Sequence, residues 1–188
     1  MLHILILLFH FNFGWEISGT VEKLPASDTL TWQPSTKLTW EDFLGEAPAR
    51  NSYAAFTYTM ISMEYSATIT NGKVKPTFEI YSAFNRRKSW VKKEKEARTA
   101  EILAHEQAHF DIAEITARKL RKALLGASFS KDSLEPKINR LYQETIQAGD
   151  LMQALYDQES NHGLNKTQQQ KWLAAVKQEL LDLKIYER

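Results

Sequence analysis

β-Branched and aromatic residues dominate two stretches in the first half of the chain, whereas apolar residues in the second half recur every three or four positions. The two stretches cover residues 54–70 and 73–84, with Asn71-Gly72 between them. Asn-Gly adopts the positive φ angles of a two-residue hairpin turn, so the pattern predicts a pair of antiparallel strands. Pro76 has no backbone N–H to donate, which predicts an edge position or a bulge in the second strand.

The spacing of three and four residues predicts three helices. The first covers about residues 90–125 and stops at Gly126, a residue type that often ends helices. The second begins near Asp132, which has capping-box spacing to Glu135, and the third begins near Asn165. Strands that come first and helices that follow indicate an α+β fold, with a small antiparallel β-sheet against a layer of about three helices.

The chain opens with an apolar run, MLHILILLFHFNFGW, which is short for a membrane-spanning helix but close to the length of a signal-peptide core. We therefore expect residues 1–18 to be a signal peptide or an N-terminal anchor. The protein would then be periplasmic or secreted, in contact with a membrane only if this segment is retained. A buried N-terminal strand is the alternative. We interpret the Ser-, Thr- and Pro-rich residues 19–37 as a linker and residues 38–188 as one domain.

Composition narrows the chemistry of the protein. A hydrophobic fraction of 43% in 188 residues suits one compact domain, and a net charge of +1 gives no reason to expect a nucleic acid as partner. The basic stretch at residues 85–93 is followed by acidic residues, which favours a solvent-exposed start of a helix over a nucleic-acid site. The chain has no cysteine, so any metal must be bound by His, Asp or Glu.

The segment AEILAHEQAHFDIAE, residues 100–114, places two histidines and a glutamate in an otherwise amphipathic helix. His105 and His109 are about one helical turn apart on one face, so both imidazoles can bind one Zn²⁺ ion. Glu106 is rotated by about 100° from His105, where it can take a proton from a zinc-bound water without binding the metal. The pattern predicts a zincin-like active-site helix, and makes residues 38–188 a zinc-dependent hydrolase domain with Glu106 as its general base.

A catalytic zinc site commonly has three protein ligands, and this helix supplies only two. Outside the N-terminal segment the remaining histidine is His162, in YDQESNHGLN, where the following glycine permits a tight turn. Downstream carboxylates compete with it as the third ligand: Glu144, Asp157 and Glu159. Asp157 could instead orient a ligating imidazole.

Three motifs together, HEQAHFD in the long helix, LTWEDF before the sheet and YDQESNHG near the end, resemble a bacterial family of uncharacterised domains described as predicted secreted zinc-dependent proteases. The resemblance covers roughly residues 36–175. It implies that His105 and His109 bind zinc, that Glu106 is catalytic and that His162 is the third ligand. The substrate would be a peptide or protein cleaved at an amide bond.

Two other functions stay open. Di-iron carboxylate proteins use paired Glu-x-x-His motifs, and this chain has Glu106/His109 and Glu159/His162. In a non-catalytic binding module, the same residues would bind a metal that stabilises the fold, and no reaction would be catalysed. If the protein is a peptidase, the hairpin of residues 54–84 could by analogy supply an edge strand that pairs with an extended substrate.

Overall fold

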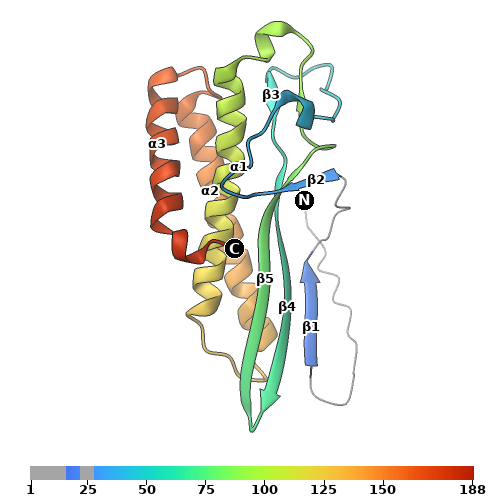
Figure 1. Ribbon diagram of the computed structural model, residues 1–188, viewed down its shortest axis with the longest axis vertical. Coiled ribbons are helices and arrows are strands. Elements are labelled where there is room, and N and C mark those ends of the chain that lie inside the picture. The colour runs from blue at the N-terminus through green and yellow to red at the C-terminus, as the bar shows by residue number, and fades with distance from the viewer. Residues whose placement is uncertain (1–15, 22–27) are drawn as a thin grey trace.

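A computed structural model describes residues 16–21 and 28–188 of the chain. Three helices cover one side of an antiparallel sheet dominated by a long hairpin (Figure 1). The elements follow one another as β1 (Glu16–Val21), β2 (Thr29–Thr31), β3 (Ala55–Phe56), β4 (Thr59–Thr70), β5 (Lys73–Asn85), β6 (Trp90–Val91), α1 (Ala100–Leu125), α2 (Leu134–Ser160) and α3 (Lys166–Asp182). Short 3-10 turns occur at Trp40–Asp42, Lys95–Ala97 and Lys184–Tyr186. The predicted α+β fold is confirmed.

The hairpin of β4 and β5 turns where the sequence predicts it. Asn71 and Gly72 have φ angles of 50° and 75°, and the strands pair in register from Thr70↔Lys73 to Thr59↔Phe84. Pro76 lies opposite Ala67 without a bulge. In the part of the chain that the structure describes, β2 pairs only with the last three residues of β5, so Pro76 lies on an edge, as its missing N–H requires.

Parts of the stretch interpreted as a linker are strands. The main sheet has the order β1-β4-β5-β2, so residues 16–21 and 29–31 pair with the two outer edges of the hairpin. The unpaired backbone groups of those edges explain why even a polar segment forms strands there. The first three residues of β1 belong to the segment predicted as a signal peptide or anchor; the rest of that prediction concerns residues 1–15, outside the described residues, and stays a prediction.

Two of the three helices begin later than the sequence predicts. Trp90 and Val91 form β6, which pairs with β3, and α1 begins only at Ala100, where the Thr99 side chain accepts a hydrogen bond from the Ile102 N–H. The predicted capping box at Asp132 is wrong, because α2 begins at Leu134 with Ser133 as its N-cap and without a capping hydrogen bond. The end of α1 before Gly126 and the cap of α3 by Asn165 are confirmed.

Helix α1 is central in the fold, packed against the hairpin on one side and against α2 and α3 on the other. Its buried positions include charged groups as well as apolar ones: Glu114 accepts hydrogen bonds from Ser82, Arg118 and Arg121. No helix within the described residues is both long and apolar enough to cross a membrane. Because α1 is covered on both sides, the His-Glu-x-x-His motif in its first half is largely buried.

Candidate metal centre

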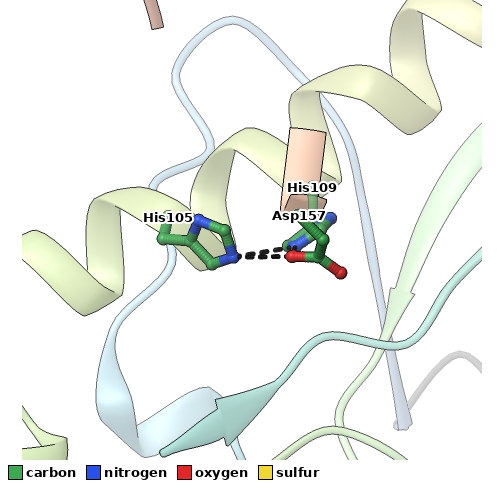
Figure 2. A group of neighbouring side chains, drawn as sticks. All are labelled: His105, His109 and Asp157. Carbon is green, nitrogen blue, oxygen red and sulfur yellow. Dashed lines mark hydrogen bonds and ion pairs between the residues drawn. The ribbon is translucent and has the colours of Figure 1, made fainter. Parts of the chain in front are cut away.

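The two motif histidines and Asp157 form one group. His105 and His109 project from α1 towards α2, and the Nε2 atoms of both face Oδ1 of Asp157, at 3.0 and 3.1 Å (Figure 2). The two Nε2 atoms are themselves 3.1 Å apart. Ligand atoms around a tetrahedral zinc, each about 2.0–2.1 Å from the metal, lie about 3.3 Å from one another. A zinc ion therefore fits among these three atoms after a small outward shift.

The other nitrogen of each imidazole is held by a glutamine. The amide nitrogen of Gln153 donates to the backbone oxygen of His109, so its Oε1 must accept from His109 Nδ1, 2.6 Å away. Gln169 Oε1 accepts from the Tyr156 hydroxyl and from His105 Nδ1, at 2.9 and 3.1 Å. The Gln153 amide thus fixes a hydrogen on His109 Nδ1, and Gln169, as oriented in the structure, accepts from His105 Nδ1. In this arrangement the Nε2 lone pairs of the neutral rings face the group of three.

Electrostatics at this group favour a cation. Two Nε2 lone pairs and a carboxylate oxygen face one another at about 3 Å, which is repulsive unless a proton or a metal ion lies between them. Burial lowers the pKa of His109, but the hydrogen bond and charge of Asp157, together with the charge of Glu106, outweigh it and raise that pKa. Burial raises the pKa of Asp157, but its hydrogen bonds to both imidazoles and their charge hold that pKa far below its usual range. A cation between these atoms, either a proton or a metal ion, would relieve the repulsion.

Glu106 lies beside the group with one free oxygen. It is 4% exposed, and its Oε2 is buried without a hydrogen-bond partner among the described residues. A buried carboxylate oxygen without a partner is costly, and such atoms are commonly found where a ligand or water binds. Glu106, both histidines and Asp157 line one cavity of about 230 Å³. The cavity thus combines three side chains that could bind a metal with a carboxylate oxygen that has no partner among the described residues.

The predicted third ligand, His162, lines this cavity and contacts Asp157, but it is not one of the three residues whose ligand atoms all lie within 4.8 Å of one another. Its Nδ1 is 3.3 Å from Asp157 Oδ1, its side chain is 42% exposed, and its ring packs against Tyr53 with centroids 4.5 Å apart. Asn161, His162 and Gly163 all have positive φ angles, a conformation that turns the chain back towards α1. The structure thus brings the rival carboxylate Asp157 next to the two imidazoles, with His162 as its neighbour.

The other two candidate carboxylates lie elsewhere. Glu144 is exposed and pairs with Arg140 at 3.9 Å, and Glu159 accepts a hydrogen bond from the Trp172 indole at 2.8 Å. Neither lines the cavity. The Glu159/His162 pair required by a di-iron centre is therefore not assembled beside Glu106.

Sequence reasoning missed Gln153, Gln169 and Tyr53. Gln153 precedes Asp157 by four residues, which places both on the face of α2 that meets α1. The four-residue spacing between Gln153 and Asp157 is therefore the sequence feature that could have predicted Gln153 near the site. Gln169 and Tyr53 come from segments remote from the motif, and only the packing of α3 and of the loop before β3 brings them close.

Comparison with known proteins places the chain in a family. No curated protein and no solved structure matches it. One family model, described as bacterial protein of unknown function (DUF922), matches residues 31–163. This range contains every residue that lines the cavity, from Tyr53 to His162. Because the match covers well over half of the sequence, the chain belongs to this bacterial family of unknown function.

Proposed function

We propose that the protein is a zinc-dependent peptidase in which His105, His109 and Asp157 bind the metal and Glu106 is the general base. The observation that carries this proposal is the meeting, in one cavity, of three convergent donor atoms and a buried carboxylate oxygen without a partner. Zinc held by these residues would polarise a carbonyl group and lower the pKa of a bound water from about 15.7 towards about 7.

The remaining chemistry belongs to residues of the chain. Glu106 accepts a proton from the attacking water and passes it to the departing amine. Gln153 and Gln169 keep both imidazoles in the tautomer that donates an Nε2 lone pair. Two imidazoles and one carboxylate can also bind iron(II). A free carboxylate beside the metal favours hydrolysis, since such a group is the proton acceptor that the reaction needs.

A peptide substrate is supported by the edge of β3 that faces away from β6, which pairs with no other strand among the described residues. Lys92 N–H donates to Ala54 C=O, and Tyr58 N–H donates to the Ser89 hydroxyl. The backbone groups of Ala54 and Tyr58 therefore face β6 and the residues next to it. Neighbouring strand residues direct their backbone groups to opposite sides, so Ala55 and Thr57 direct theirs the other way. Ala55 and Thr57 both line the cavity. An extended peptide can pair with this edge beside the metal-binding group.

Replacing Glu106 by Gln tests the proposal. Zinc content of the purified variant should equal that of the wild type, while hydrolysis of an unfolded protein such as casein should fall by about 10²–10⁴-fold. Glu101→Gln, a change of equal charge at the exposed start of α1, is the matched control and should leave both measurements unchanged. Equal hydrolysis by the wild type and Glu106→Gln would refute the role of Glu106, and a zinc-loaded wild type that cleaves no peptide or protein would refute the proposal.

A further inference from the structure

A second, larger cavity adjoins the metal centre. It has a volume of about 630 Å³ and lies between the start of β4, the middle of α1 and the face of α2. Gln153, which holds the His109 imidazole, lines this cavity as well. The two cavities are therefore linked through a residue that belongs to the metal centre.

The same three segments line both cavities in succession. Residues 53–57 line the metal-site cavity, and residues 58–61 line the second one. On α1, Ala113 follows His109 by four residues, which continues the same helical face away from the metal. The two cavities therefore lie in succession along the start of β4, and we refer to them together as the groove.

Polar side chains of α2 form one wall of this groove. They follow one another at helical spacings of four and three residues: Gln143, Gln147, Asp150, Gln153 and Asp157. The amides of Gln143 and Gln147 can donate to and accept from a peptide backbone, whereas the amide of Gln153 already binds His109. Such a wall suits an extended chain with unpaired backbone groups.

The second cavity carries one charged side chain. Among the described residues that line it, Asp150 is the only acidic or basic one. It is exposed, and no ion pair with another of the described residues engages its carboxylate. Apolar side chains of the floor, such as Met60 and Ile146, can contact the aliphatic stem of a lysine or arginine whose charged end reaches Asp150.

We infer that this groove binds the substrate chain beyond the scissile bond, and that Asp150 selects a lysine or arginine about three residues from that bond. The spacing follows from helix geometry. Asp150 and Asp157 are seven helical residues apart, about 10 Å along α2, and an extended chain covers that distance in about three residues. The inference rests on the proposed peptidase function and adds to it a preference for substrates with a basic residue near the scissile bond.

Cleavage-site profiling tests this preference. The full-length zinc-loaded protein is incubated with a peptide pool prepared by cleavage after glutamate, so that lysine and arginine remain internal, and the new termini are identified by mass spectrometry. Basic residues should be enriched by about fivefold at one position, two to four residues from the cut, because an exposed ion pair contributes at most about that factor. Asp150→Asn should abolish the enrichment, and Asp150→Lys should replace it by an enrichment of acidic residues.

Asp132→Asn, an equal loss of charge at an exposed position outside both cavities, should retain the enrichment. Circular dichroism of all three variants checks that they fold. Cleavage without any positional enrichment, or enrichment that survives Asp150→Asn, would overturn the inference while leaving the peptidase proposal intact. An absence of cleavage by the wild type would overturn both.

Discussion

Replacing Asp157 by Asn and, separately, His162 by Gln distinguishes the two candidates for the third metal ligand. Asp157 Oδ1 is 3.0 and 3.1 Å from the two Nε2 atoms, whereas His162 contacts Asp157 through one 3.3 Å approach and is 42% exposed. Removing a residue that only supports a ligand costs about 10–100-fold in metal affinity. Loss of Asp157, the proposed ligand, should therefore weaken zinc binding by more than about 100-fold, or at least about 2.7 kcal/mol. His162→Gln should cost about tenfold or less, because its contact is long and exposed.

The assay is a competition titration of the metal-free proteins against a chromophoric zinc chelator, with circular dichroism to confirm that both variants fold. The reasoning would be refuted if His162→Gln weakened binding more than Asp157→Asn did. In that case His162 would occupy the ligand position, and Asp157 would orient an imidazole from behind, as one interpretation of the sequence suggested.

Three further predictions follow from the same contacts. Gly163→Ala should lower the free energy of unfolding by about 1–2 kcal/mol and weaken zinc binding, because φ is +83° and the new Cβ would lie 3.3 Å from the His105 ring; unchanged thermal unfolding and zinc titrations would contradict this. Glu114→Ala should cost about 3–5 kcal/mol in urea unfolding, since two arginines lose their buried partner, and a cost no greater than that of an exposed control such as Glu101→Ala would contradict it. The pKa of His109 is raised, so its contribution to the stability of the metal-free protein is complete below its usual pKa of 6.5 and is lost as the pH rises through the raised value. Zinc binding should show the opposite trend and weaken as the pH falls through that value, because protons then compete with zinc for the imidazole. Unfolding of the wild type and His109→Gln between about pH 5.5 and 8, with and without zinc, checks these opposite trends, and parallel trends would contradict them.

The parts of the fold that could be predicted were those specified by local sequence. Asn71-Gly72 has intrinsic access to positive φ, and the helices have long runs of regular apolar spacing. The short strands β1, β2 and β6 were missed because long-range pairing, rather than local propensity, makes them strands. Strand β3 lies within the predicted strand of residues 54–70, but it pairs with β6 and not with β5. Trp90 and Val91, for example, were assigned to a helix, yet they pair with β3.

For the site, the sequence predicted the residues that α1 contributes, but it left open which residue from another segment joins them. His105, Glu106 and His109 lie together because the helical repeat brings them together, whatever the rest of the chain does. The choice between Asp157 and His162 depends on where α2 ends and how Asn161 to Gly163 turn, and spacing alone does not specify either. Asp157 and His162 are only five residues apart, so the conformation of the turn between α2 and α3 decides which of them lies next to the two imidazoles.

Anomalous X-ray scattering from crystals of the zinc-loaded protein, measured on both sides of the zinc absorption edge, tests the central assignment most directly. We predict one zinc peak per chain, about 2.0–2.2 Å from His105 Nε2, His109 Nε2 and Asp157 Oδ1, with Glu106 facing the ion but not bound to it. A peak elsewhere, or a zinc ion coordinated by Glu106 with no position left for water, would contradict the account.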